Sequence, residues 1–489
     1  MIRKTAISIG VCSVLFSLSA QAEGYKLFEQ SVSSMGNAYA GRGAQITDAS
    51  LVYSNPAALT RLSGRQLSGG LNFITAKTHY SNAQAQSANG QPVLGRSEGS
   101  NSLNELVPYV FYSDTFSETL SWGIGLYVPY GLSSDYDDDF VGRYFADETS
   151  IQVLSLQPSI GYKLNEQWSV GMGISINRAT GTLSKAKDHS GLCELGEQTI
   201  NAMFGAPVYN EAYCNSHYEV EGDDVTFGYT LGIHGEPVVG TRLALTYHSA
   251  LHFTLTGDST ITNTPITSAN VVGNPNYMVT KPHLPAIDLK TGKLAAQSLL
   301  TEASKLALTT PATLAFSLDQ QLSKALSVQF SAAWTQWSKF QSIDILSTDA
   351  QPSISLNTQQ EANLNNPGQI GYIPEYWTNS WSFALGASYA LQSDLTLKAG
   401  VAYDENPIKS ERKTARIPTD NRVWLSVGAN WQLADNLSVD LAYGYLFTGD
   451  VQVNEHEYNQ QDERLYNSGY QGDYSNKGQL FALGANYSF

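Results

Sequence analysis

The feature that most constrains the fold of this chain is a two-residue alternation of apolar and small polar side chains. Residues 168–177 read WSVGMGISIN, so that Trp, Val, Met and Ile alternate with Ser, Gly and Asn. Residues 424–433 and 437–447 show the same pattern. A period of two places the apolar side chains on one face of a β-strand. The opposite face, which lacks Lys and Glu, is typical of a barrel with a polar lumen and a lipid-facing exterior.

The stretches between these strands are of two kinds. Long segments rich in Asn, Asp, Gly and Ser alternate with short polar turns, which are expected at residues 116–119, 164–167, 236–241, 322–325, 391–394 and 434–436. Long outer loops and short periplasmic turns are the pattern of bacterial outer-membrane barrels. Six short turns, with both chain ends in the periplasm, give seven hairpins. We therefore predict an all-β fold, a 14-stranded antiparallel transmembrane β-barrel.

The two ends of the chain carry patterns that predict export and insertion into the outer membrane. Residues 1–22 combine a basic start, an apolar core and an Ala-Gln-Ala cleavage site, which is the pattern of a secretory signal peptide. We expect the mature chain to begin at Glu23 and to lie in the bacterial outer membrane, with both termini in the periplasm. Residues 481–489 alternate and end in Phe, which resembles the signal read by the barrel assembly machinery. No run of 18 apolar residues follows the signal peptide, so no spanning helix is expected.

Composition and charge narrow the set of partners. The formal net charge is −16 over 489 residues, which argues against nucleic acid as a partner. We expect a monomer that contacts outer-membrane lipid and lipopolysaccharide, with no cofactor and no metal. Cys193 and Cys214 lie in one polar stretch, and in an oxidising compartment they predict a disulfide that closes an external loop. Two free thiols are the alternative.

The segment ahead of the first strand differs from the rest, because residues 23–64 show no alternation. A barrel of this size encloses a wide lumen. Irregular backbone is tolerated at membrane depth only when it is buried in protein or lines a cavity. We therefore predict that residues 23–64 form a plug inside the lumen and that residues 65–489 form the barrel with long extracellular loops. The Asn55-Pro56 turn is expected to direct the plug against the wall, and a solvent-exposed turn is the alternative.

The same segment resembles a known family. Residues 24–62, GYKLFEQSVSSMGNAYAGRGAQITDASLVYSNPAALTRL, are similar to the hatch of the FadL-type long-chain fatty acid transporters, which include toluene and xylene uptake channels. Asn55, Pro56 and Ala57 match the Asn-Pro-Ala motif of that hatch. The resemblance continues in register at residues 161–173, 242–249, 306–314, 334–340, 395–408 and 416–428. It implies passive uptake of long-chain fatty acids or other hydrophobic compounds, with an external capture groove, an internal apolar pocket and sideways release at a kinked third strand.

The third strand is expected to contain an irregularity. It reads LSWGIGLYVPYGL over residues 120–132. Proline cannot donate to a neighbouring strand and is found at edges, strand starts or bulges. Because a closed barrel has no edge, Pro129 together with Gly131 predicts a local break in the wall and thus a lateral opening. The alternative places Pro129 in the external loop, but the resemblance, which covers Tyr130 and Gly131, favours the kink.

The resemblance also implies roles for individual side chains. Tyr25 of the hatch is expected to contact the ligand, Leu183 to line the internal pocket, and Lys185 to pair with a carboxylate. A solvated loop lysine is the alternative for Lys185. Asp344 stands where a second basic residue is expected, which leaves an uncharged hydrocarbon open as the ligand. For residues 290–306, an amphipathic helix at the external groove and an irregular loop are both left open.

Two functions from other classes remain as alternatives, an outer-membrane lipid hydrolase and a general porin. No Ser/His/Asp set can be separated from chance among so many serines, and a hydrolase has no need of a plug, so we expect no enzymatic activity. A general porin predicts strong ion conductance, whereas a plugged barrel predicts little.

Overall fold

The computed structural model describes residues 24–188, 215–263, 287–288, 293–294, 299–350, 354 and 368–489 of the chain. The expected signal peptide, residues 1–22, lies outside this part, and so do Cys193 and Cys214, the two residues of the expected disulfide. Among the residues described, no helix is both long enough and apolar enough to cross a membrane.

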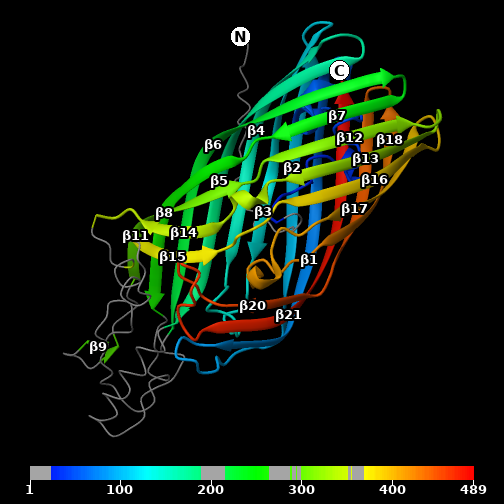
Figure 1. Cartoon of the computed structure of the whole chain (residues 1–489). Coiled ribbons are helices and arrows are strands. Elements are labelled where there is room, and N and C mark those ends of the chain that lie inside the picture. The colour runs from blue at the N-terminus through cyan, green and yellow to red at the C-terminus, as the bar shows by residue number, and fades with distance from the viewer. Residues whose placement is uncertain are drawn as a thin grey trace, which may run out of the picture.

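An antiparallel β-barrel makes up most of the molecule (Figure 1). Nine strands of its wall are single segments: β1 (Gln66–Gln86), β2 (Gly99–Thr115), β3 (Leu120–Ser134), β4 (Thr149–Lys163), β5 (Trp168–Asp188), β6 (Asn215–Val238), β17 (Leu395–Asp404), β18 (Arg422–Ala434) and β21 (Gly469–Ser488). Five more consist of two segments in line: β7 (Thr241–His248) with β8 (Leu251–Asn263), β11 (Leu299–Thr310) with β12 (Thr313–Gln321), β13 (Leu326–Thr335) with β14 (Ser342–Ser347), β15 (Gln369–Pro374) with β16 (Ser380–Ala390), and β19 (Leu437–Thr448) with β20 (Val451–Glu455). β21 pairs with β1 and closes the barrel. The prediction of 14 antiparallel strands is confirmed.

Short and long connections join the strands alternately. Each short turn expected from the sequence lies between two strands, as between β4 and β5. The chain ends beside these turns, where the Ser488 amide donates to the Asn436 carbonyl at 2.9 Å and the Phe489 amide donates to the Arg65 carbonyl at 3.0 Å. The small hairpin of β9 (Ile287–Asp288) and β10 (Lys293–Leu294) belongs to a long connection, and β9 lies toward the opposite end of the barrel (Figure 1).

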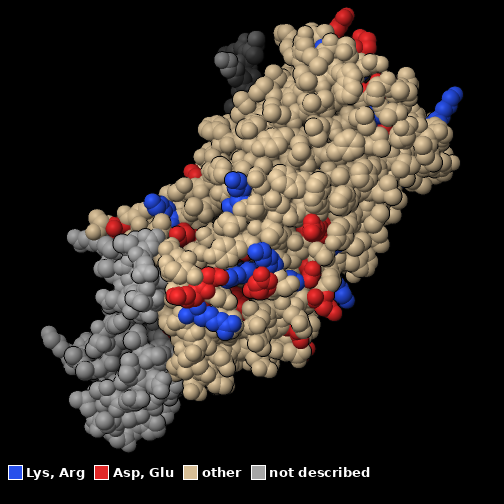
Figure 2. Space-filling model, viewed as in Figure 1, with Lys and Arg blue, Asp and Glu red and all other residues tan. Residues whose placement is uncertain are grey.

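Side chains along the strands alternate between the exterior and the lumen. On β5, Ile174 and Ile176 are 49% and 40% exposed, whereas Ser175 and Asn177 are 7% and 1% exposed. Small polar groups therefore face the lumen and apolar groups face outward. Figure 2 shows the result on one face, where a broad band without charge separates the charged groups near the short turns from those near the long connections. Such a band matches the hydrocarbon region of a membrane.

The helix considered for residues 290–306 is wrong where the structure describes that stretch. Residues 299–306 belong to β11, which pairs with β8 from Leu299 to Thr310. Leu306 is buried while Lys305 is exposed, which is the alternation of a strand. The apolar residues of a short amphipathic stretch fit either period, and pairing with a neighbouring strand decides between them here.

The hatch, residues 24–64, lies inside the barrel (dark blue in Figure 1). It contains the short helices α1 (Val32–Met35) and α2 (Leu51–Ser54) and the 3₁₀-helix η1 (Pro56–Arg61). Asn55 caps η1 by accepting a hydrogen bond from the Ala57 amide, and Pro56 occupies the first turn, where its missing amide hydrogen costs nothing. Two further 3₁₀-turns, η3 (Trp337–Lys339) and η4 (Ser410–Arg412), lie between wall strands. Nearly every hatch residue is buried, because the wall surrounds it.

Candidate functional site

The wall is open between β2 and β3 along part of its height. These strands are paired over six residues each, from the pair of Thr115 with Ser121 to the pair of Val110 with Leu126. Beyond that point β2 continues beside β1 as far as Gly99, and β3 continues beside β4 as far as Ser134. The two strands therefore part, although each keeps its other neighbour.

Pro129 lies within β3 at the place where the strands part, and not in an external loop. Tyr127 pairs with Ser155 of β4, and Tyr130 pairs with Val153. Two residues of β3 thus lie opposite a single residue of β4. This is a β-bulge, which bends the strand and increases its twist. Since proline lacks an amide hydrogen, Pro129 cannot restore the pairing.

The start of the hatch covers the edge that β2 leaves. The Leu27 amide donates to the Pro129 carbonyl at 2.9 Å, and the Gly131 amide donates to the Tyr25 carbonyl at 2.9 Å. Between these bonds, Lys26 and Tyr130 form an antiparallel bridge. Residues 25–28, called the leading segment below, thus add to the edge of β3 as a short extra strand.

Tyr25 is packed in an aromatic cluster. Its side chain is fully buried, and its hydroxyl donates to the Thr309 carbonyl at 3.1 Å. Four rings surround it with centroid distances of 4.8 to 5.9 Å, those of Trp337, Phe340, Tyr130 and Trp377. Tyr25 lines none of the three cavities described below. A ligand therefore reaches Tyr25 only if the cluster rearranges.

One acidic group borders this aromatic cluster. Glu375, in the connection between β15 and β16, accepts a hydrogen bond from Nε1 of Trp377 at 2.7 Å.

Leu183 of β5 lines an apolar cavity, called the Leu183 cavity below. The cavity contains about 440 Å³ of atom-free space, part of it open to solvent. Its other apolar lining residues come from β4, β6, β8, β11 and β14 and are Ile151, Val220, Leu255, Leu306, Leu308 and Ile343. Such a lining suits a hydrocarbon chain.

Lys185 is already paired with an acidic residue. Its Nζ lies 2.6 Å from Oε1 of Glu457, and Glu457 also accepts a hydrogen bond from the Ser468 hydroxyl at 3.1 Å. Asp344 lies on β14 and accepts a hydrogen bond from the Gln369 amide group at 2.8 Å. A ligand carboxylate at Lys185 would therefore compete with Glu457 or lie beside its negative charge.

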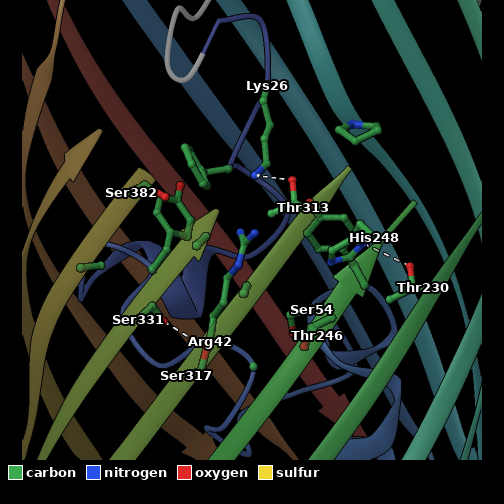
Figure 3. Close-up of a pocket in the computed structure, with 18 of the residues that line it drawn as sticks. Lys26, Arg42, Ser54, Thr230, Thr246, His248, Thr313, Ser317, Ser331 and Ser382 are labelled. Atoms are coloured by element: carbon green, nitrogen blue, oxygen red, sulfur yellow. Dashed lines mark hydrogen bonds between the residues drawn. The ribbon is translucent and has the colours of Figure 1, made fainter. Parts of the chain in front are cut away.

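A larger cavity lies between the hatch and the wall (Figure 3). This central cavity encloses about 1080 Å³ of atom-free space, part of it open to solvent. Pro129 and Tyr130 of the kink line it, together with Phe28 of the leading segment. Two basic side chains of the hatch, Lys26 and Arg42, extend into it.

Arg42 was not singled out from the sequence, although a signal for it exists. It stands in AYAGRGA, residues 38–44, where most neighbours are Ala or Gly. A charged side chain in a segment expected to be buried requires a partner or a polar space. The prediction of a plug in the lumen was therefore enough to identify Arg42 as a candidate functional residue.

A third cavity, the gap cavity, reaches both strands that border the opening and is also lined by β1, β18, β19 and β21. Asn101 and Leu103 of β2 line one side, and Ser133 and Ser134 of β3 line the other. It contains about 590 Å³ of atom-free space, part of it open to solvent. Both parted strands thus border a hollow.

The Asn-Pro-Ala motif, residues 55–57, holds the hatch against one side of the wall. The Asn55 side chain donates to the carbonyl of Ile233 on β6 at 3.1 Å. A Cβ atom added to Gly171 of β5 would lie 2.3 Å from the Ala57 nitrogen. Glycine is therefore required for this close approach. The motif is buried, so the alternative of a solvent-exposed turn is not what the structure shows.

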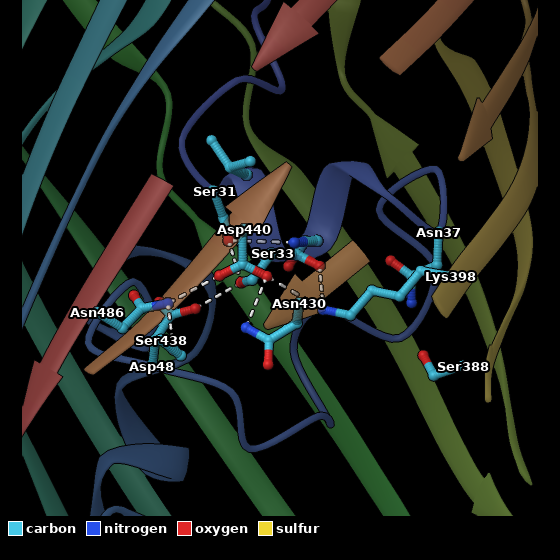
Figure 4. Close-up of polar contacts among 12 residues, drawn as sticks. Ser31, Ser33, Asn37, Asp48, Ser388, Lys398, Asn430, Ser438, Asp440 and Asn486 are labelled. Atoms are coloured by element: carbon cyan, nitrogen blue, oxygen red, sulfur yellow. Dashed lines mark hydrogen bonds and ion pairs between the residues drawn. The ribbon is translucent and has the colours of Figure 1, made fainter. Parts of the chain in front are cut away.

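A buried polar network anchors another side of the hatch (Figure 4). Lys398 of β17 donates to the Ser33 carbonyl at 2.6 Å and lies 3.8 Å from Asp440 of β19. Asp440 also accepts a hydrogen bond from Asn486 of β21 at 2.8 Å. Residues 31–62, called the hatch body below, are thus tied to the wall by charged and polar contacts.

These features define a class of protein. The uncharged exterior band shows a barrel that spans a membrane, and closed barrels of this kind occur in the bacterial outer membrane. The hatch occupies the lumen, and the wall opens sideways between two strands. The protein is an outer-membrane barrel plugged from within.

The particular family follows from comparison with known proteins. The chain belongs to the family described as "Outer membrane protein transport protein (OMPP1/FadL/TodX)", whose model matches residues 13–489. It is 25% identical over 496 residues to the long-chain fatty acid transport protein of Escherichia coli (strain K12), covering 99% of this chain and 98% of that protein. It is 27% identical over 501 residues to outer membrane protein P1 of Haemophilus influenzae (strain Rd), covering 98% of each. The family resemblance seen in the sequence is confirmed.

Solved structures share the fold. A FadL homologue of Pseudomonas aeruginosa matches with a TM-score of 0.77 at 24% identity, covering 95% of this chain and 100% of that chain. The toluene transporter TodX of Pseudomonas putida matches with a TM-score of 0.62 at 16% identity, covering 96% and 99%. These likenesses confirm the barrel architecture.

Proposed function

We propose that this protein takes up long-chain fatty acids or other hydrophobic compounds across the outer membrane without an energy source, and that they leave sideways between β2 and β3. One observation carries this proposal: the β2–β3 ladder ends at Leu126, and the leading segment takes the place of β2 beyond it. A strand edge covered by a short separate segment is suited to act as a gate. The relationship to a long-chain fatty acid transport protein supports the substrate class.

The Leu183 cavity is the internal site in this proposal. Burial of each CH₂ group contributes roughly 0.8 kcal/mol, so a long acyl chain binds tightly and leaves slowly unless the site changes. Tyr25 belongs to the same apolar cluster as Leu183. Withdrawal of the leading segment would therefore weaken that site and uncover the β3 edge in one movement.

Release sideways has a physical advantage for an apolar compound. The exterior of the wall faces lipid, so a compound that passes through the gap cavity enters the bilayer without crossing water. An open porin lumen would instead require a water-filled path, and the buried hatch occupies that space. Passage by way of the opening at Pro129, Tyr130 and Gly131 thus fits the chemistry of the cargo.

Several further properties belong to this proposal. Residues 1–22 act as a signal peptide, and the short turns and both ends of the mature chain face the periplasm. A disulfide between Cys193 and Cys214 closes an external loop. The barrel is inserted by the assembly machinery and works as a monomer among outer-membrane lipid and lipopolysaccharide. The grouping of the chain end with the short turns supports the orientation.

Gly131→Trp tests the lateral route. It places a bulky side chain at the kink, on the residue whose amide donates to the Tyr25 carbonyl. We expect uptake of radiolabelled oleate by cells to fall by about tenfold while the barrel stays folded, because a blocked gate limits the rate. Gly449→Trp is the matched control, since nothing lies within 4 Å of a Cβ atom at that position. Normal uptake by a folded Gly131→Trp protein contradicts lateral release, and strong ion conductance by the unmodified protein favours a porin.

A further inference from the structure

We infer that the central cavity contains an anion-binding site, in which Arg42 holds the carboxylate of an amphipathic ligand and so favours acids over uncharged hydrocarbons. The inference rests on the proposed function, in which ligands pass through the lumen. It differs from the carboxylate site expected at Lys185, which Glu457 already occupies.

The surroundings of Arg42 are aromatic. Its guanidinium carbon lies 5.5, 5.9 and 5.3 Å from the ring centroids of Phe28, Tyr39 and Tyr53. Among the residues that the structure describes, the guanidinium forms no hydrogen bond and has no carboxylate within 4 Å, and the carboxyl of Glu29 interacts with it from a greater distance. Figure 3 shows the side chain extending into the cavity. Its five N–H donors are therefore available to a ligand.

Three other basic residues of the wall differ in this respect. Lys185, Lys398 and Arg242 each have a carboxylate within 4 Å, on Glu457, Asp440 and Asp319 respectively. Ring faces offset part of the cost of removing a cation from water, but they leave the N–H groups unsatisfied. A cation held in this way favours an anionic ligand over an apolar one.

The rest of the lining fits the head of a carboxylic acid. Lys26 extends into the same cavity, where its Nζ lies 3.2 Å from the Thr313 hydroxyl. Further hydroxyl groups face the cavity from the hatch and wall, on Ser54, Thr246, Ser317, Ser331 and Ser382. Asp404 is the acidic residue in the described lining, and its carboxylate accepts a hydrogen bond from Nε1 of Trp424 at 2.6 Å. Planar guanidinium groups bind carboxylates through two parallel hydrogen bonds.

The cavity also offers surface for an apolar tail. Tyr127, Pro129 and Tyr130 of β3 and Leu251 of β8 line it. A ligand with its carboxylate on Arg42 would extend its chain toward the place where β3 parts from β2. An alkane or a simple aromatic compound would leave Arg42 desolvated without a partner, which costs free energy.

Binding of two matched probes tests the inference. The purified full-length protein is reconstituted in lipid nanodiscs, and binding of decanoate and of decan-1-ol is measured by calorimetry at pH 8. The unmodified protein should bind decanoate the more tightly. Arg42→Met should weaken decanoate binding by about tenfold or more, as expected for a charge-assisted hydrogen bond, and leave decanol unchanged. Arg42→Lys should retain most of the preference for the acid.

A matched control and a second variant keep the test decisive. Arg65→Met removes an exposed arginine at the turn end, where the nearest acid, Asp114, lies 3.7 Å away, and should change neither probe. Arg42→Gln replaces Arg42→Met if the latter fails to fold. Unchanged decanoate binding in a folded Arg42 variant overturns the inference while the proposed function stands. If the unmodified protein binds neither probe, the proposed function fails and the inference fails with it.

Discussion

The leading segment and the hatch body belong to one continuous plug but are held in different ways. The leading segment is joined to β3 by two backbone hydrogen bonds and packs Tyr25 among four aromatic rings. The hatch body contacts the wall through Lys398, the Asn-Pro-Ala motif and close approach to wall glycines. An apolar ligand can replace aromatic packing, but it cannot replace an ion-paired network. The plug thus combines a part that cargo can displace with a part that it cannot.

The largest effect is expected when the anchor of the hatch body is broken. Asp440→Asn leaves Lys398 buried without its carboxylate, since both side chains are at most 8% exposed. Loss of one member of a buried pair destabilises a protein by about 3–5 kcal/mol. Urea unfolding in lipid vesicles, followed by tryptophan fluorescence, measures the change. The double variant Lys398→Met with Asp440→Leu should recover at least half of the loss, and a normal midpoint for Asp440→Asn would show that the network is not an anchor.

A smaller loss is expected when the close approach of hatch and wall is blocked. Gly171→Val places a side chain where a Cβ atom would already lie 2.3 Å from the Ala57 nitrogen. Overpacking of this kind costs about 1–3 kcal/mol, and displacement of the hatch body should raise ion conductance in a planar bilayer. Gly69→Val is the control, because the nearest atom to its Cβ would lie 3.5 Å away. Equal conductance for the two variants would contradict the role given to residues 55–57.

The smallest expected effect is a difference in amide exchange rate between the two parts of the hatch in the unmodified protein. Amides in residues 25–28 should exchange with deuterium at least about tenfold faster than those in residues 31–62, because two backbone hydrogen bonds open more readily than the body network. Decanoate should speed exchange in the leading segment and leave the body unchanged. Peptide-resolved mass spectrometry gives both rates. Uniform protection along the hatch would remove the contrast between its two parts.

The wall could be predicted from the sequence because its pattern is local. Alternation in residues 168–177 and turns such as 434–436 arise from neighbouring residues, and the resulting strands and turns are present. Pro129 marks the kink for the same reason, since one residue without an amide hydrogen disturbs any ladder. β11 was ambiguous because its identity depends on pairing with β8, which is distant in sequence.

The polar contacts of the candidate site could not be predicted in this way. Lys185 matches the family pattern, but its partner Glu457 lies 272 residues away. The contact of Arg42 with Phe28 and Tyr53 likewise depends on how the hatch folds. Tyr25 was expected to contact ligand, and its place in a packed cluster depends on Trp337 and Trp377 from distant strand connections. Tertiary packing decides each of these cases.

The displaceable leading segment is tested most directly by locking it to β3. Lys26 and Tyr130 oppose each other between the two backbone hydrogen bonds, and Cα atoms of such a pair lie about 4.5 Å apart, within reach of a disulfide. Lys26→Cys with Tyr130→Cys is made in a Cys193→Ser, Cys214→Ser background, and each single cysteine variant serves as a control.

Uptake of radiolabelled oleate is then measured before and after oxidation, with the cross-link verified by mass spectrometry. The account predicts that oxidation of the double variant lowers uptake by about tenfold or more, that reductant restores it, and that the single variants do not respond. Undiminished uptake by protein in which the cross-link is complete would show that cargo passes without movement of the leading segment, and would contradict the account.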